Sequence, residues 1–254
     1  MIDEAAIILA IAVADHHDRV EEQLTASIDG IELDIDAIAA PHHGRLHRLN
    51  DVGPGRLVVR YAATVTGAAP PLAATDLEWV QYLRPSRYCE SDRLGPLARA
   101  EFAGLEGADL LAGISSWVGA NIGYVPGSSR PIDGAVATLL AREGVCRDFA
   151  HLTAALLRAN DVAARVVAVY APGLDPMDFH AVTEALLDGA WHVVDPTCLA
   201  PRQSMVRIAT GADAADVAFV TNVGGIIELA DMNVTAVVAP SLPSDDITRV
   251  TELR

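Results

Sequence analysis

Residues 144–160 read GVCRDFAHLTAALLRAN and decide the fold, because a cysteine stands where a helical pattern begins. The apolar side chains that follow recur at helical spacing and form one stripe, made of Phe149, Leu152, Leu156 and Leu157. We therefore predict a helix from Cys146 or Arg147 to about Ala159. At the start of such a helix, unpaired backbone N–H groups and the helix dipole favour a thiolate.

Three strand-like runs follow this helix, at residues 165–170, 180–187 and 191–194. Asp188-Gly189 is a strong signal for a two-residue hairpin turn between the last two runs. With that turn, Asp195 stands two residues along from the position opposite His180. An even offset keeps the His180 and Asp195 side chains on one face of the sheet, within diagonal reach.

The rest of the chain divides by its pattern into an α+β protein. Strand-like runs at residues 5–14, 31–36 and 56–66 predict a β-rich N-terminal unit over residues 1–84. Helical patterns at about 108–122 and 134–142 place the preceding helices in a core over residues 85–240. Apolar runs at 215–221 and 234–238 close the core, and residues 241–254 are expected to form a polar C-terminal tail.

Cys146, His180 and Asp195 have the chemical character of a thiol catalytic triad. In such a triad the carboxylate orients the imidazole, whose other nitrogen faces the thiol. A thiolate–imidazolium pair attacks a carbonyl to give a thioester, and the backbone N–H of Cys146 can donate to the oxyanion. Taken singly, each residue has an ordinary interpretation: a small buried thiol, a strand histidine and a turn aspartate.

The composition narrows the partners and the compartment. The 254 residues carry a net charge of −16, which would repel nucleic acid and anionic membranes, so neither partner is expected. The apolar run at residues 5–14 is too short to span a bilayer, and acidic Asp3 and Glu4 precede it, so we expect a cytoplasmic protein. Three cysteines in this setting argue against a disulfide framework.

Three sequence blocks closely resemble the motifs of the bacterial transglutaminase-like family, whose members have a papain-like core. They are residues 144–152 (GVCRDFAHL), 178–181 (DFHA) and 191–197 (WHVVDPT). Residues 82–88 and the run 208–217 (IATGADAADV) are also similar to stretches of that family, as are Trp117, Asn121, Ile122, Tyr124 and Gly127. The resemblance depends on agreement in order and spacing and extends over most of the chain.

This resemblance implies that Cys146 is the nucleophile, His180 the general base and acid, and Asp195 the residue that orients His180. It implies acyl transfer or hydrolysis at a peptide or protein amide, or at a Gln/Asn-type side chain, without a cofactor. Two alternatives stay open: a non-catalytic binding module that retains the papain-like cleft, and a processing cysteine peptidase. Cys198 and Ala212 depart from the family, which more often has Asn and a basic residue there.

Further residues have possible roles around the triad. Tyr124, Trp117 and Asn121 are candidates for an oxyanion donor or a pocket wall. A zinc site would need members of a wider set (Cys146, His151, His180, His192, Asp195 and Cys198), but no CxxC or HxxxH pair occurs, and we expect no metal. Arg147 and Asp148 are expected to pair with surrounding structure. The histidine pairs at 16–17 and 42–43 are interpreted as solvated loop residues.

Overall fold

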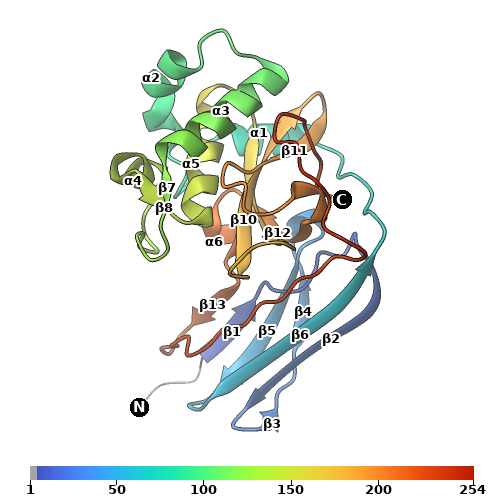
Figure 1. Ribbon diagram of the computed structural model, residues 1–254. Helices are drawn as coiled ribbons and strands as arrows, with labels where there is room; N and C mark the ends of the chain where they lie inside the picture. The colour runs from blue at the N-terminus through green and yellow to red at the C-terminus, as the bar shows by residue number, and fades with distance from the viewer. Residues whose placement is uncertain (1–4) are drawn as a thin grey trace.

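The computed structural model describes residues 5–254 and has an α+β architecture. A helix-rich core stands above a β-rich unit in the view of Figure 1. Within the described residues, no helix is both long and apolar enough to cross a membrane.

The core is built on an antiparallel sheet of four strands in the order β11–β10–β9–β12. Their bounds are Ala164–Tyr170 (β9), Phe179–Leu187 (β10), Ala190–Val194 (β11) and Val206–Gly211 (β12). The first three confirm the predicted runs to within one residue. Asp188 and Gly189 both have left-handed φ angles, and Leu187 pairs with Ala190, as a two-residue hairpin requires.

Six helices accompany this sheet, and the longest two pack over it (Figure 1). They are α1 (Asp76–Leu83), α2 (Ser91–Glu101), α3 (Gly107–Asn121), α4 (Ala135–Ala141), α5 (Cys146–Ala159) and α6 (Ala214–Val217). Helix α5 has the predicted bounds, and α3 and α4 lie within a residue of theirs. Thr183 donates a 2.8 Å hydrogen bond from its hydroxyl to the carbonyl of Ala150, which fixes β10 against α5.

The β-rich unit consists of two antiparallel sheets. One has the order β13–β1–β5–β4 and the other the order β3–β2–β6. The bounds are Ala5–Leu9 (β1), Asp18–Ile28 (β2), Ile31–Glu32 (β3), Asp36–Ala39 (β4), Arg45–Val52 (β5), Leu57–Thr66 (β6) and Val220–Val223 (β13). The run 56–66 is confirmed as β6, whereas the expected strand at 31–36 is replaced by the two short exposed strands β3 and β4.

The arrangement of strands and helices differs from the predicted division at residue 84. Strand β13 lies in the predicted core but pairs with β1, and so completes a sheet of the N-terminal unit. Helix α1 lies before the predicted boundary but packs on the core, where Tyr82 meets Trp191 edge to face at 5.8 Å. Each unit therefore contributes an element to the other.

The interpretation of the four histidines as solvated loop residues was wrong for three of them. His17 is buried and His16 is half-buried. His42 Nε2 forms a 2.6 Å hydrogen bond with the Tyr82 hydroxyl. His42 also lies 3.1 Å from the carboxylate of Glu78. The loops that carry these histidines are covered because the N-terminal unit packs on the core at that point.

Buried ion pairs connect the strands beside these histidines. Glu184 on β10 pairs with Arg165 on β9 at 2.8 Å and with Arg207 on β12 at 2.6 Å, and all three side chains are fully buried. Arg165 also reaches Glu78 of α1 at 2.8 Å. Burial opposes the ionisation of Glu184, but the charges of Arg207 and Arg165 overcome it and lower its pKa to about 2.

Candidate active site

The first turn of α5 presents Cys146, whose side chain is partly accessible to solvent. Two residues before it, Gly144 ends the two-residue strand β8 (Glu143–Gly144), which pairs with β7 (Gly123–Tyr124). A Cβ atom at Gly144 would lie 2.7 Å from the Cβ of Asp148, so only glycine leaves room for the next turn. The backbone of Gly144 can therefore pass close to Asp148, and the helix that begins at Cys146 can follow immediately.

Asp148 and Arg147 stabilise this turn. The buried Asp148 carboxylate accepts a 2.8 Å hydrogen bond from the Val145 backbone N–H and a 3.0 Å hydrogen bond from Arg147. The same Arg147 nitrogen donates to Ser129 and to the carbonyl of Arg130. The expectation that Arg147 and Asp148 pair with surrounding structure is confirmed.

His180 and Asp195 are in direct contact. His180 Nε2 lies 2.9 Å from Asp195 Oδ2, and the two residues are only 1% and 4% exposed. His180 is the second residue of β10, and Asp195 directly follows β11. The observed pairing of β10 with β11 has the register expected from the sequence. Continued by one residue, it places Asp195 two residues along from the position opposite His180, which accounts for the contact.

The second oxygen of Asp195 is held by its own loop. Asp195 Oδ1 accepts hydrogen bonds from the Thr197 backbone N–H at 3.0 Å and from the Thr197 hydroxyl at 2.7 Å. Helix α3 also approaches this loop closely, because a Cβ atom at Gly119 would lie 2.9 Å from the carbonyl oxygen of Pro196. The carboxylate is thereby oriented toward His180 before any substrate binds.

The pKa of His180 depends on two neighbours, Asp195 and Cys146. Burial alone lowers the pKa of His180, but the charge and hydrogen bond of Asp195, and next the neighbouring Cys146, outweigh burial and raise the pKa to about 10. His180 Nδ1 has no well-aligned hydrogen bond to any part of residues 5–254. The imidazole is therefore held by Asp195 through Nε2, and Nδ1 is the ring nitrogen that Asp195 leaves available.

Tyr124 is the accessory candidate that the fold brings to the nucleophile. Burial, and next the charge of Cys146, raise the pKa of the Tyr124 hydroxyl to about 12. The charge of Asp178, two residues before His180, acts on Tyr124 in the same direction. Of the three accessory candidates, Tyr124 is therefore the one whose hydroxyl is influenced by Cys146.

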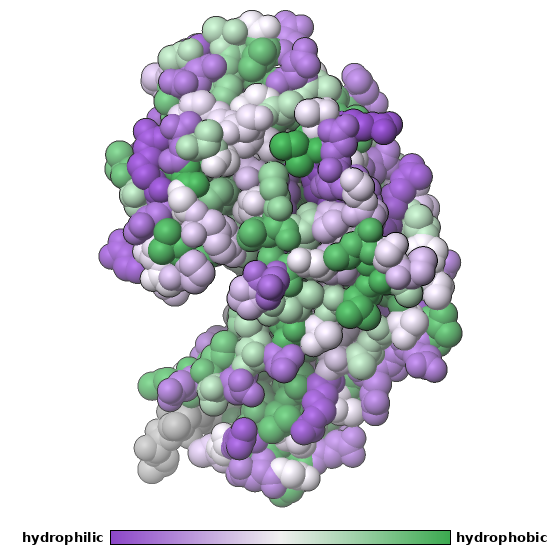
Figure 2. All heavy atoms as spheres, viewed as in Figure 1, coloured by the Kyte–Doolittle hydropathy of each residue, from purple (hydrophilic) through white to green (hydrophobic). Residues whose placement is uncertain are grey.

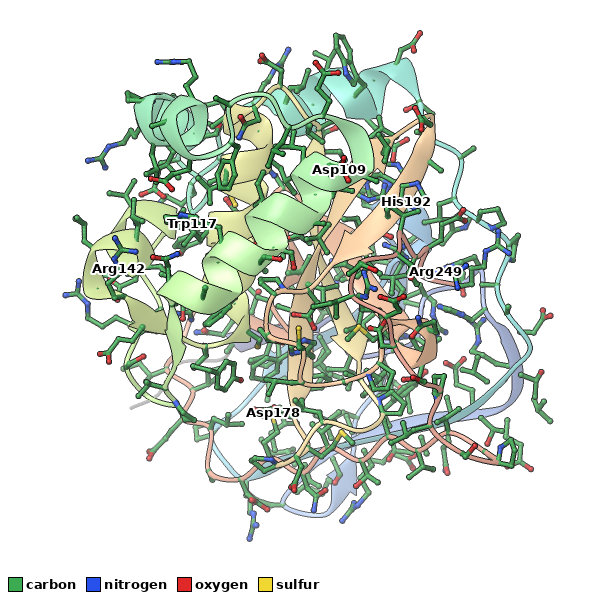
Figure 3. The ribbon with its side chains drawn as sticks, turned by 45° about the horizontal axis from the view of Figure 1, so that its top comes forward. Asp109, Trp117, Arg142, Asp178, His192 and Arg249 are labelled. Carbon is green, nitrogen blue, oxygen red and sulfur yellow. The ribbon has the colours of Figure 1, made fainter. Side chains whose placement is uncertain are left out.

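Trp117 and Asn121 belong to a different cluster. The Trp117 indole N–H donates to Glu101 at 3.0 Å, and Arg142 lies over its ring. Asn121 donates to the Trp117 carbonyl and accepts from Arg142. Figure 3 places Trp117 and Arg142 together on the helical side, apart from Asp178. The hydrogen bonds of both side chains are thus made within this cluster, and none of them involves Cys146.

The remaining cysteines and histidines are dispersed. Cys89 is fully buried, and burial raises the pKa of its thiol to about 12, whereas Cys198 is exposed on the Asp195 loop. His151 stacks on Tyr88 and accepts a hydrogen bond from the Ala214 backbone N–H. Across residues 5–254, no three His, Cys, Asp or Glu side chains are grouped to hold a metal ion.

Three residues that support the site were not identified from the sequence: Thr197, Gly119 and Asp178. A glycine inside a helical pattern is unfavourable unless a neighbour approaches closely, so Gly119 carried a usable signal. Asp178 lies in a quoted motif, but no pattern in the sequence indicates that its charge acts on Tyr124. Thr197 was recognised only as part of the block around Asp195.

The molecular surface is deeply notched between the helix-rich core and the N-terminal unit (Figure 2). In the matching ribbon view, the loop after β7 overhangs this notch from above and the end of β13 borders it from below (Figure 1). Strand β8 lies beside that loop and leads directly into Cys146.

Known proteins share the fold that carries this site. A family model described as the transglutaminase-like superfamily matches residues 105–196, which contain Cys146, His180 and Asp195. A solved structure from Cytophaga hutchinsonii, described as a "putative cysteine protease", is 31% identical with a TM-score of 0.80. The match covers 95% of this chain and 91% of that one.

Two mycobacterial proteins described as uncharacterized are also similar. One from Mycobacterium tuberculosis is 42% identical over 74 residues, which are 27% of this chain and 24% of that protein. One from Mycobacterium leprae is 24% identical over 147 residues, or 54% of this chain and 53% of that protein. The matched stretch spans only about a quarter to a half of the length of these relatives. The match to the Cytophaga hutchinsonii protein extends over nearly all of both chains and agrees with the family model, so this chain belongs to the transglutaminase-like superfamily.

Proposed function

We propose that this protein is a cysteine enzyme that cleaves an amide through a thioester on Cys146. The observation that carries the proposal is the placement of His180, whose Nε2 is 2.9 Å from Asp195 and whose raised pKa reflects both Asp195 and Cys146. An imidazolium held beside a thiol at a helix start stabilises the thiolate, which is the nucleophilic form.

The proposed reaction has two halves. The Cys146 thiolate attacks the amide carbonyl to form a tetrahedral oxyanion, for which we assign the backbone N–H of Cys146 and the Tyr124 hydroxyl as hydrogen-bond donors. The oxyanion collapses, the carbon–nitrogen bond breaks, and His180 gives its proton to the departing amine. His180 then takes a proton from water, which attacks the thioester and releases the acid and the free thiol.

We propose a peptide or protein amide as substrate, with hydrolysis as the outcome. The description of the Cytophaga hutchinsonii relative as a cysteine protease favours a backbone amide over a Gln or Asn side chain. The same catalytic groups would also serve transfer to an amine, because an amine can replace water in the second half. A processing peptidase is the form of this proposal in which the peptide is a segment of a partner protein.

The rival proposal is a non-catalytic binding module with a papain-like cleft. It requires no particular protonation of His180 and no hydrogen bonds to both oxygens of Asp195. The arrangement that holds the Asp195 carboxylate through Thr197 and His180 favours catalysis, because binding alone gains nothing from an oriented imidazole.

Mass spectrometry of the intact protein, combined with product analysis, tests the proposal. The protein is incubated with a mixed peptide library and with a Gln-containing carboxamide substrate, then quenched in acid to preserve thioesters. We expect an acyl adduct on Cys146 and new peptide N-termini, both lost in Cys146→Ala and retained in Cys198→Ser. Peptides bound without adduct or cleavage would support the binding module, and ammonia release without new N-termini would move the substrate to side-chain amides.

A further inference from the structure

Residues 242–253 form an ordered segment without helix or strand, which we name the C-terminal clasp. In Figure 1 the chain crosses back from the N-terminal unit and ends beside β11. The sequence pattern predicts a polar tail here, but the clasp packs against the core. It contacts the strand and the loop that lie on either side of Asp195.

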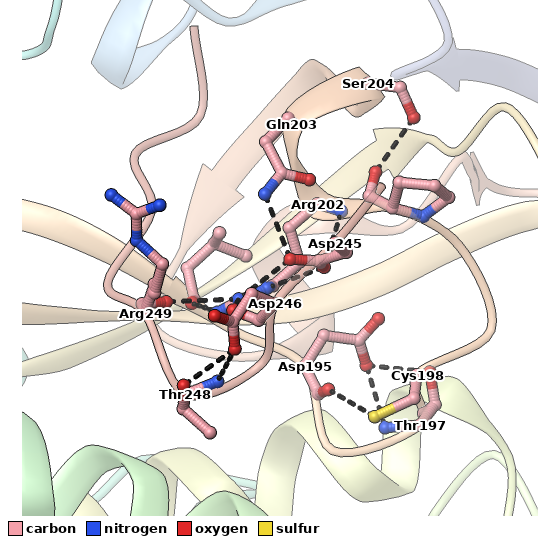
Figure 4. Close-up of polar contacts among 12 residues, drawn as sticks. Asp195, Thr197, Cys198, Arg202, Gln203, Ser204, Asp245, Asp246, Thr248 and Arg249 are labelled. Atoms are coloured by element: carbon pink, nitrogen blue, oxygen red, sulfur yellow. Dashed lines mark hydrogen bonds and ion pairs between the residues drawn. The ribbon is translucent and has the colours of Figure 1, made fainter. Parts of the chain in front are cut away.

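The strongest contact in the clasp is between Arg202 and Asp245. Arg202 follows Asp195 by seven residues and is 6% exposed. Its Nε and Nη2 donate to the two oxygens of Asp245, each at 2.9 Å, and its backbone N–H donates to Asp245 at 3.0 Å. Figure 4 shows this pair beside the loop that holds Asp195, Thr197 and Cys198.

The remaining donors of Arg202 join the clasp to β11. Nη2 also donates to the carbonyls of Asp246 and Arg249, at 2.8 and 3.1 Å. Nη1 donates to the carbonyl of Val193 at 3.2 Å. Val193 stands two residues before Asp195, so one guanidinium connects the strand that precedes Asp195 with the clasp.

The clasp also makes its own contacts with β11. The backbone N–H of Val193 donates a 2.7 Å hydrogen bond to the carbonyl of Thr251. Leu253 is 2% exposed and belongs to the apolar cluster of Val169, Val182 and Val193. Arg249 lies near His192 (Figure 3), and both residues line a small cavity of about 20 Å³ beside α3.

The other end of the clasp reaches the loop that leads to His180. Leu242 packs beside Gly173 and Pro201, since a Cβ atom at Gly173 would lie 3.2 Å from atoms of both side chains. Gly173 stands in the connection between β9 and β10, and His180 is the second residue of β10. The clasp thus contacts both segments from which the His180–Asp195 pair is built.

We infer that the C-terminal clasp positions Asp195 against His180, and that Arg202 and Asp245 are its positioning residues. The inference rests on the proposed function, since it concerns the same triad. The Asp195 loop is anchored at Val193 on one side and at Arg202 on the other, and both anchors depend on the clasp. Loss of the Arg202–Asp245 pair frees the loop, which weakens the hold of Asp195 on the imidazole.

Asp245→Asn tests the inference, with Asp231→Asn as the matched control. Asp231 is an exposed carboxylate in the extended segment before the clasp. Within residues 5–254, its side chain makes no hydrogen bond or ion pair. The measurement is the rate of Cys146 alkylation by iodoacetamide from pH 5 to pH 9 in the full chain. We expect Asp245→Asn to slow alkylation at pH 6 by about tenfold or more and to shift the profile toward that of a free thiol, because small displacements of catalytic groups are costly. Asp231→Asn should match the parent protein.

A second variant covers the case in which Asp245→Asn does not fold. Arg202→Lys keeps a positive charge for Asp245 but loses the simultaneous donors to Val193, Asp246 and Arg249. It should change the profile in the same direction by a smaller factor. A folded Asp245→Asn or Arg202→Lys protein with the parent profile overturns the inference. A parent protein without fast alkylation of Cys146 contradicts the proposed function instead.

Discussion

His180 Nε2 and Asp195 Oδ2 are 2.9 Å apart, and both side chains are almost completely buried. Because the contact is buried, it is much less screened by salt than a surface ion pair. It leaves Nδ1 as the available imidazole nitrogen, and the charge of Asp195 raises the pKa of His180. The first two predictions concern this contact.

Asp195→Asn should lower amide turnover by about 100-fold or more, the range attributed to a positioned general acid or base. The amide cannot supply the charge that raises the pKa of His180, and it can hold the ring in an unproductive tautomer. The measurement is kcat on the peptide identified in the adduct experiment. Thr197→Ser, which keeps the hydroxyl that holds Asp195, is the matched control and should retain most of the activity.

The stability that His180 contributes should fall as the pH rises from about 7 to about 10. The folded-state pKa of about 10 lies above the ordinary 6.5, so this stabilisation is complete below 6.5 and lost through 10. Urea unfolding of the parent protein and of His180→Gln at several pH values gives the difference in unfolding free energy. A difference that is unchanged between pH 7 and pH 10 would show that His180 is not protonated in the folded protein.

Acid should destabilise the protein through the histidines at the junction of the two units. Burial, then the charges of His17 and Arg207, lower the pKa of His16 to about 3, while burial and Arg207 lower that of His17 to about 4. The unfolded chain takes up these protons first, so stability is lost as the pH falls from about 6.5 toward 4. The double variant His16→Asn, His17→Asn should show a shallower fall in unfolding free energy over this range. A slope equal to that of the parent would exclude these two residues as its source.

Glu184→Gln should destabilise the fold by about 3–5 kcal/mol, the usual cost of leaving a buried charge without its partner. Both Arg165 and Arg207 would lose their carboxylate in a buried environment. Chemical denaturation measures the change, and the exposed Glu228→Gln is the control of equal charge. A loss below about 1 kcal/mol, typical of surface pairs, would mean that water or another group compensates the arginines.

The sequence predicted the elements around the triad because local rules and long-range packing agree there. The helix at Cys146 has a regular apolar stripe, and the Asp188-Gly189 turn determines the hairpin register without help from other elements. The relation of His180 to Asp195 follows from that turn. The hairpin and helix geometry shows only that Cys146, His180 and Asp195 could form a triad. The resemblance to the family motifs is what singles out these three residues.

The sequence failed where the partner of a residue lies far along the chain. Strand β12 contains Arg207 and strand β2 is mostly polar, so neither shows the alternation of a half-buried strand. The ion pair with Glu184 compensates for the burial of Arg207, and Glu184 lies 23 residues earlier in the chain. Likewise the C-terminal clasp reads as a polar tail, since its burial depends on Arg202 more than 40 residues earlier.

The central claim is that Cys146 and His180 form a catalytic thiolate–imidazolium pair, and selective alkylation tests it most directly. The protein is treated with iodoacetamide at pH 6, and the modification of each cysteine is followed by peptide mass spectrometry. The account predicts that Cys146 reacts much faster than the exposed Cys198, that buried Cys89 stays unmodified, and that His180→Ala slows Cys146 to the rate of Cys198. Equal rates for Cys146 and Cys198, unchanged by His180→Ala, would contradict the catalytic pair.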